Sequence, residues 1–219
     1  MEKYLPFLRS LPLFAGLAEP ELLRLLQCLQ ADAPRFAEGQ IIWEPFRRQP
    51  YLCVAAEGLF QLMQEDFRGN RCIVGCYAPG DIFSGSALSM EGAPPFYLHA
   101  KGGATAIVLA VPEKTFPEDS RNIQVIFYRN LMGAMIEHEK RLLHKIEVLS
   151  RRTTRDKLMG YLVAQAAQQG SRTVMVEFTR QELADTLGVD RSAMCTELTR
   201  MQKDGLLRCR ARSFELLGE

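Results

Sequence analysis

The residues best suited to a defined chemistry lie near the end of the chain. Thr179-Arg180-Gln181-Glu182 is a capping box, in which the first and fourth side chains each accept a backbone N–H at a helix start. The helix that follows ends at Gly188, a residue that tolerates the left-handed conformation of a C-cap. Asp190 then caps a second helix, which runs from Arg191 to about Lys203. This spacing predicts two short helices joined by a tight turn.

The outer face of the second helix has the chemistry of a DNA reader. Short polar side chains occupy its first half, so its backbone can enter a major groove about 12 Å wide. Arg191 can pair with guanine or reach a phosphate, and the Ser192 and Thr196 hydroxyls can donate or accept. Arg180 and Gln181 suit phosphate contacts. The candidate DNA-contacting residues are Thr179, Arg180, Gln181, Arg191, Ser192, Cys195, Thr196, Thr199, Arg200 and Arg210.

Three further features surround these two helices. The expected core positions are Ala184, Leu187, Val189, Met194, Leu198 and Met201. Residues 206–217 predict a small hairpin with Arg208, Arg210 and Arg212 near its tip. Residues 151–219 contain 12 basic and 9 acidic side chains, whereas the rest of the chain contains 15 basic and 17 acidic ones. The C-terminal segment therefore has the positive net charge that favours binding to a polyanion. Together these features predict a winged helix-turn-helix; the alternative is a solvated helix face on a three-helix domain.

Short strands separated by turns precede this segment, from about Phe36 to Phe116. Residues Phe36–Trp43 contain a glycine turn that leads into an apolar run. The expected strands after it are Tyr51–Met63 broken in two at Gly58, Arg71–Tyr77, and Ala104–Val111 stopped by Pro112. Their spacing predicts an antiparallel barrel, roll or sandwich. A short helix at Glu19–Gln27, with proline and acid in its first turn, is expected before them.

From about Ile123 to Leu149 the apolar period becomes helical. Its stripe consists of Leu131, Met135, His138, Leu142, Ile146 and Leu149. At ~1.5 Å per residue the helix is about 40 Å long, more than one small roll would cover. We expect it to pair with a second copy in a two-fold coiled coil; the alternative is packing within its own monomer.

Roll, long helix and winged helix-turn-helix, in this order, resemble the Crp–Fnr family of bacterial transcription regulators. The most specific match runs from Phe178 through Gly188 to Met194, and residues 11–17 and 78–83 are similar to the family's N-terminal helix and roll. The resemblance implies an α+β fold. Residues 1–119 would form an antiparallel β-roll of the cyclic-nucleotide-binding type, 120–149 a dimerisation helix, and 150–219 the DNA-binding domain.

The resemblance also implies partners. These are a second copy of the chain, double-stranded DNA with a pseudo-palindromic operator, and RNA polymerase. It further implies that the state of a sensory roll is transmitted through the long helices to the DNA-binding domains.

The family's cyclic-nucleotide cassette is degenerate in this chain. In the family, a Gly-Glu pair holds the ribose and a later Arg-Ser-Ala neutralises the cyclic phosphate. Here Gly85-Ser86 and Phe96-Tyr97-Leu98 stand at those places, and no arginine occurs between Arg71 and Arg121. Burying a phosphodiester without a cation costs several kcal/mol, so we do not expect cyclic AMP to bind. The candidate effector pocket, for an apolar or aromatic ligand or else a filled core, is Phe83, Gly85, Ser86, Phe96 and Tyr97.

Cofactors are not expected either. The family's iron–sulfur sensors use an N-terminal cysteine group, and no cysteine precedes Cys28 here. The alternative is a haem sensor that uses His99 or Cys76 of the roll, and the absence of any CxxC argues against a metal site. Nucleophile–base pairs, P-loops and dinucleotide fingerprints are also missing from the sequence, so we do not expect an enzyme.

Composition sets the remaining bounds. With 47% hydrophobic residues, 24% charged residues and a formal charge of +1, the chain is not disordered. Its longest largely apolar run, Ala104–Val111, is too short to cross a bilayer, so we expect no membrane contact and a cytoplasmic protein. The leading hypothesis is a homodimeric, sequence-specific DNA-binding regulator. The alternative is a small-molecule or redox sensor acting through protein interaction. In a redox form of the leading hypothesis, oxidation of Cys195 would switch off DNA binding.

Overall fold

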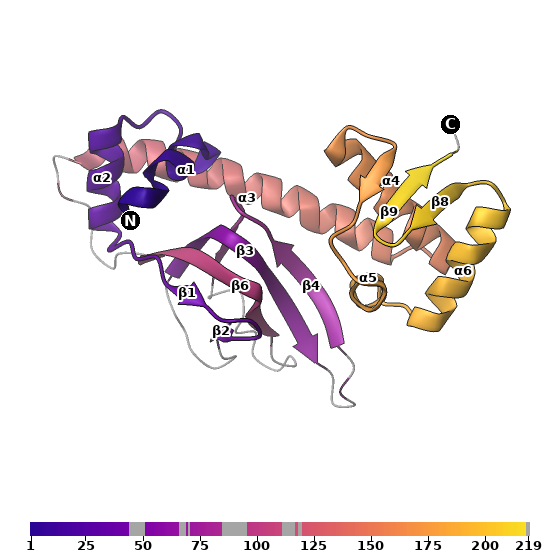
Figure 1. Cartoon of the computed structure of the whole chain (residues 1–219). Helices are drawn as coiled ribbons and strands as arrows, with labels where there is room; N and C mark the ends of the chain where they lie inside the picture. Colours follow the sequence, from indigo (N-terminus) through magenta and orange to yellow (C-terminus); the bar gives the residue numbers. More distant parts are fainter. Residues whose placement is uncertain are drawn as a thin grey trace. The chain divides into compact units, whose positions relative to one another are not determined.

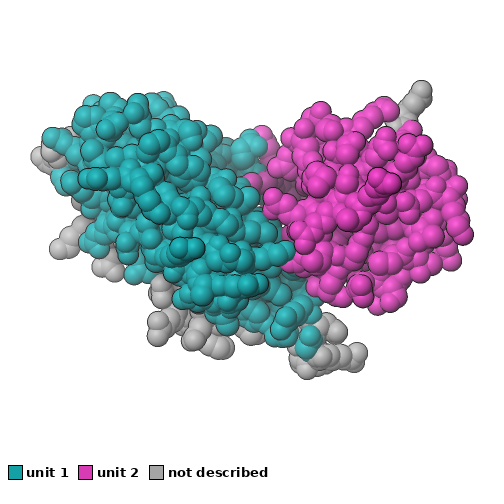
Figure 2. Space-filling view, viewed as in Figure 1, with its two compact units in different colours: residues 1–139 teal, residues 140–219 magenta. Residues whose placement is uncertain are grey.

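The chain forms two compact units, Met1–Glu139 and Lys140–Glu219 (Figure 2). The computed structural model describes residues 1–43, 51–65, 69, 71–84, 96–110, 117 and 120–217. A long helix, α3 (Arg121–Leu149), begins in the first unit and ends in the second (Figure 1). The first unit is built around a sheet, and the second combines three helices with a small sheet of its own.

Helical turns open the first unit. They are a 3-10 turn at Glu2–Tyr4, α1 (Leu5–Ser10), a second 3-10 turn at Pro12–Phe14, and α2 (Glu19–Cys28). At the start of α2 the Glu21 carboxylate accepts the Ala18 N–H at 2.8 Å, and proline stands in the first turn. The helix predicted at residues 19–27 is therefore confirmed.

An antiparallel sheet follows these turns. Its strands are β1 (Arg35–Phe36), β2 (Ile41–Trp43), β3 (Tyr51–Glu65), β4 (Arg71–Tyr77), β5 (Ile82–Ser84) and β6 (Phe96–Ala110). The order β1-β6-β3-β4 forms the main path, while β2 also pairs with β6 and β5 with β3. The two longest strands, β3 and β6, run side by side along most of their length (Figure 1).

The strand break expected at Gly58 is instead a bulge inside one long strand. Gly58 has φ +74°, and the register between β3 and β6 shifts on both sides of Glu57. A Cβ at Gly58 would lie 2.5 Å from the Gly103 carbonyl oxygen, so the two backbones meet where no side chain fits. The partner strand begins at Phe96 rather than at Ala104, because it continues through this bulge.

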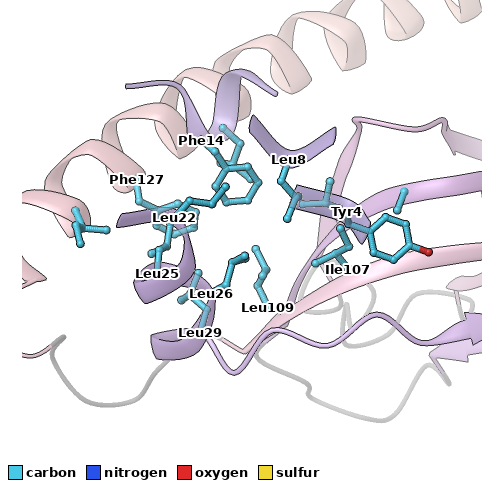
Figure 3. Close-up of a cluster of buried hydrophobic side chains, with 14 residues drawn as sticks. Tyr4, Leu8, Phe14, Leu22, Leu25, Leu26, Leu29, Ile107, Leu109 and Phe127 are labelled. Carbon is cyan, nitrogen blue, oxygen red and sulfur yellow. The ribbon is translucent and has the colours of Figure 1, made fainter. Parts of the chain in front are cut away.

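An apolar cluster joins the N-terminal helices to the sheet and to the first half of α3 (Figure 3). Its buried members include Leu8, Leu22, Ile107 and Phe127, and the rings of Phe14 and Phe127 stack with centroids 6.3 Å apart. A second cluster on the sheet contains Phe60, Phe83 and Leu98. The N-terminal helices and the first half of α3 are thus joined to the sheet of the first unit by buried apolar surface.

The second unit contains α4 (Thr154–Gln169), β7 (Thr173–Met175), α5 (Arg180–Leu187), α6 (Arg191–Lys203), β8 (Leu207–Arg210) and β9 (Ser213–Leu216). The three strands pair in the order β7-β9-β8. The predicted winged helix-turn-helix is confirmed, and α4 and β7 are additional to the predicted elements. Thr153 caps α4 by accepting the Asp156 N–H, and Gly170 ends it in the left-handed conformation.

One arginine fixes the turn from α3 into α4. Arg151 bonds Glu147 at 2.7 Å and donates to the Asp156 carbonyl at 3.2 Å. Its guanidinium lies against Gly160, where a Cβ would come within 2.7 Å of the arginine Cζ. The absence of a Cβ at Gly160 therefore leaves room for the Arg151 guanidinium in this position.

Candidate nucleic-acid interface

Helix α5 begins at a capping box made by its own sequence. The Thr179 hydroxyl accepts the Glu182 N–H at 3.2 Å, and the Glu182 carboxylate accepts the Thr179 N–H at 2.7 Å. Two backbone donors at the helix start are thereby satisfied without help from other elements. Thr179 itself stays exposed, as a phosphate contact would require.

The turn between α5 and α6 is equally local. Gly188 takes φ +59°, and the Val189 N–H donates to the Ala184 carbonyl at 3.1 Å. The Asp190 carboxylate then accepts the Ala193 N–H at 2.8 Å and starts α6. Every signal used to predict the turn thus has its expected partner.

Buried side chains hold α6 to the rest of the unit. The cluster includes Val148, Leu158, Leu162, Val174, Leu183, Ala184, Leu187, Met194, Leu198, Met201, Leu207 and Phe214. Members from α6 recur at three- and four-residue steps, so one face of the helix is buried and the opposite face is left for other contacts.

The opposite face of α6 carries the predicted reading side chains. Arg191, Ser192, Thr196, Thr199 and Arg200 are exposed, and Cys195 is half-buried. The Thr199 hydroxyl donates to the Cys195 carbonyl at 3.0 Å. Within residues 120–217, the side chains of Arg191, Ser192 and Thr196 have no hydrogen-bond or ion-pair partner, so their polar atoms are available to a ligand.

The start of α5 adds a supported cation. The Arg180 guanidinium carbon lies 4.6 Å from the ring centroid of Phe214, a buried residue of β9. This cation–π contact holds a half-buried arginine at a helix N-terminus. Gln181 is exposed, and its amide donates to Asp185 at 2.7 Å. The supporting role of Phe214 was not predicted, because it depends on a residue 34 positions away.

The hairpin β8–β9 forms the wing. Its turn passes through Ala211, which has φ +46°, and the Cys209 N–H donates to Gln202 of α6 at 3.0 Å. Arg208 forms an ion pair with Glu215 at 3.6 Å, whereas Arg210 is exposed without a partner in the part of the chain that the structure describes. The wing thus adds a second set of cations beside α6.

An apolar row runs along α3. Positions at heptad spacing are Val125, Tyr128, Met132, Met135, Glu139, Leu142, Ile146 and Leu149; all are exposed except Leu149, which is half-buried. We call this row the α3 seam. Met135, Leu142, Ile146 and Leu149 of the predicted stripe belong to it. The other two lie beside it: Leu131 packs against the N-terminal cluster, and His138 stacks on Tyr77.

The predicted effector-pocket residues divide between two faces of the sheet. Phe83 and Phe96 belong to the apolar cluster around Phe60, with Phe83 and Phe60 centroids 5.2 Å apart. Tyr97, next along the strand, faces the other way and donates to Glu65 at 2.5 Å. Burial, with this hydrogen bond second, raises the pKa of the Tyr97 phenol. Gly85 and Ser86 lie outside the described residues.

Metal-ligating side chains are dispersed. Among the described residues, no three His, Cys, Asp or Glu side chains are grouped to hold a metal ion. His99 Nε2 contacts the Met63 sulfur, and Gln61 on β3 lies between His99 on β6 and Cys76 on β4. Burial raises the pKa of the Cys53 thiol to about 12, which keeps it protonated and unreactive. In the same described segments, no helix has the length and apolar character of a membrane span.

Comparisons with known proteins agree with this geometry. A family model described as a Crp-like helix-turn-helix domain matches residues 156–218. No curated protein sequence matches the chain significantly. Among solved structures, a CooA mutant from Carboxydothermus hydrogenoformans is 20% identical, with a TM-score of 0.70 over 90% of this chain and 91% of that one.

Two other regulators have the same fold. FixK2 from Bradyrhizobium japonicum is 18% identical, with a TM-score of 0.64 over 86% of this chain and 93% of its own. The c-di-GMP responsive regulator CLP from Xanthomonas campestris is 16% identical, with a TM-score of 0.66 over 92% and 100%. Residues 156–218 therefore form a Crp-like helix-turn-helix domain, in a chain that has the fold of the Crp–Fnr transcription regulators.

Proposed function

We propose that this protein is a transcription regulator that binds a specific DNA sequence through α6. The observation that carries the proposal is the exposed first half of α6, where Arg191, Ser192 and Thr196 have no protein partner among the described residues. Side chains of this length on a helix that enters the major groove reach base edges. Arg180, Arg200 and Arg210 stand where phosphate contacts would fix the register.

The α3 seam supports a homodimer. Val125, Met132 and Ile146 are each at least 60% exposed, an unfavourable state for apolar side chains in water. A parallel two-stranded coil would bury the a and d positions of both copies along one two-fold axis. Two helix-turn-helix domains related by that axis fit a pseudo-palindromic operator with half-sites about one helical turn of DNA apart.

We propose that the sheet domain senses its effector, if one binds, without the phosphate chemistry of cyclic AMP. The cluster around Phe60 and Phe83 is apolar, and no arginine occurs between Arg71 and Arg121. A buried phosphodiester would lack its cation there. An apolar or aromatic effector, or none, suits these side chains, and we retain the expectation that neither haem nor an iron–sulfur cluster is present.

The test is a selection of bound fragments from the source genome, followed by fluorescence anisotropy of a recovered site at several salt concentrations. We expect a shared inverted-repeat motif and affinity that falls steeply with salt, because phosphate contacts release counterions. Binding of equal strength to every fragment would remove sequence specificity from the proposal. Absence of binding to any DNA or to heparin at low salt would favour the alternative, a sensor acting through protein contacts.

A further inference from the structure

Helix α6 contains one acidic residue, Glu197, on the element proposed to approach a polyanion. Its side chain is 15% exposed, between the buried face and the outer face of the helix. A carboxylate there repels phosphates unless a cation neutralises it. The partners of Glu197 therefore affect how α6 meets DNA.

Arg155, near the start of α4, supplies that cation. Its Nε lies 2.6 Å from Glu197 Oε1, and its Nη2 lies 2.7 Å from Asp204 Oδ2 at the end of α6. One guanidinium thus bridges the carboxylate of Glu197 inside α6 and that of Asp204, which caps the end of the helix. The hydrogen bond to Glu197, followed by that to Asp204, raises the pKa of Arg155.

Arg200 is a second and weaker partner of the same carboxylate. Its Nη1 lies 3.4 Å from Glu197 Oε2, and its side chain is 66% exposed. Exposed ion pairs of this kind contribute little, so Arg200 can exchange Glu197 for a phosphate. The exchange is inexpensive only while another cation stays on Glu197, because an unpaired carboxylate would hold Arg200 back.

We propose that Arg155 is a positioning residue for DNA binding, which retains Glu197 and so releases Arg200 to a backbone phosphate. Arg155 itself makes no contact with DNA. This inference rests on the proposed function, and it assigns to Arg155 an effect on the DNA affinity of the same helix-turn-helix domain. It predicts that removing Arg155 has the same effect on DNA binding as removing Arg200.

The experiment uses the full-length protein and the operator fragment recovered by selection. Anisotropy over a salt series gives affinity and salt slope for wild type, Arg155→Met, Arg200→Ala, Glu197→Gln and the double variants Arg155→Met/Glu197→Gln and Arg155→Met/Arg200→Ala. Methionine keeps an apolar stem without charge. The matched control is Arg152→Met, which removes an exposed cation that has no partner in residues 120–217.

We expect Arg155→Met and Arg200→Ala each to weaken binding on the order of tenfold. Each should flatten the plot of log affinity against log salt by about 1.8, since a homodimer loses two phosphate contacts of ~0.9 each. The double variant Arg155→Met/Arg200→Ala should lose little more DNA affinity than either single variant. Adding Glu197→Gln to Arg155→Met should restore the wild-type DNA affinity and salt slope, because the carboxylate that retains Arg200 is then absent.

Three results would overturn the inference. One is an Arg155→Met effect that persists undiminished with Glu197→Gln, which would make Arg155 a direct phosphate contact. The second is an Arg155→Met effect no larger than that of Arg152→Met. The third is weaker DNA binding by the single variant Glu197→Gln than by wild type. This result decides the question if Arg155→Met fails to fold. A wild-type protein that binds no DNA would instead refute the proposed function, so the two failures are distinguishable.

Discussion

The imidazole of His138 stacks on the ring of Tyr77, with centroids 6.3 Å apart and planes inclined by 21°. The contact places His138 on the face of α3 that meets the first unit's sheet. The α3 seam occupies the adjacent face, with Met135 and Leu142 on either side of His138 in sequence and both exposed. One helix thus packs one face on its own sheet and leaves another exposed, the face that we propose pairs with a second copy.

The first prediction concerns Glu139, the charged position in the α3 seam. In a parallel dimer the two Glu139 carboxylates face each other across the axis, and like charges there oppose pairing. Glu139→Gln should lower the dimer dissociation constant by roughly threefold, the Coulomb energy of two charges some 7 Å apart in water. Sedimentation equilibrium measures this constant, and Glu137→Gln, on the outer side of the helix, is the control. Equal effects of the two variants would place the seam elsewhere.

The second prediction concerns base reading. Arg191→Ala should cost about 1–3 kcal/mol of binding free energy and relax specificity at one base pair of each half-site, if the guanidinium reads guanine. Gel-shift titrations with the operator and its single-base variants measure both effects. A loss spread evenly over all sequences would reassign Arg191 to a phosphate.

The third prediction concerns the packing of Arg151 on Gly160. Gly160→Ala should destabilise the protein by at most about 1 kcal/mol, because the added methyl moves the flexible end of the Arg151 side chain out of its partly exposed hydrogen bonds. In an Arg151→Ala background the same change should become neutral or stabilising, since alanine is favoured over glycine inside a helix by ~1 kcal/mol. Urea denaturation of the four variants completes the cycle. The same penalty in both backgrounds would show that Arg151 is not the obstacle.

The fourth prediction concerns pH. The Glu57 carboxylate accepts hydrogen bonds from Tyr4 and Thr105, each at 3.1 Å, and the Tyr4 bond is the first cause of its lowered pKa. A carboxyl with a lower pKa in the folded state stabilises the fold above its unfolded pKa, ordinarily 4.5, and loses this contribution as pH falls through the folded pKa. The melting temperatures of wild type and Glu57→Gln should differ at neutral pH, and the difference should shrink as the pH falls from 4.5 through the lower folded-state pKa. A difference in melting temperature that stays constant across this pH range would contradict the assignment.

The fifth prediction concerns cyclic AMP. Isothermal titration should detect no stoichiometric binding, because the sequence between Arg71 and Arg121 supplies no guanidinium for the phosphate. Tight binding at one site per chain would refute the expectation and show that another group neutralises the charge.

The helix-turn-helix could be predicted because its signals are local. Thr179, Gly188 and Asp190 each act on backbone groups within five residues, so their spacing alone fixes where the helices start and end. Helix α4 has the same kind of signal in Thr153, Asp156 and Gly170, so its start and end were also predictable from local sequence. The strand β7 has no such signal, because only its pairing with β9 defines it.

The sheet was less predictable because its decisive contacts are distant in sequence. Gly58 predicts a break when only its neighbours are considered, yet Gly103, 45 residues later, makes it a bulge. The α3 stripe had a similar ambiguity. Helical period places Leu131 and His138 beside Met135, but only the packed sheet and N-terminal helices determine which of these apolar residues are covered.

The pairing of Arg151 with Gly160 also constrains how the chain can vary over evolution. A lineage that keeps the arginine in this position favours a residue without a Cβ at position 160, whereas one that shortens residue 151 gains room for alanine. Substitutions at the two positions should therefore occur together among homologues, although one position lies in the turn after α3 and the other lies nine residues later, inside α4.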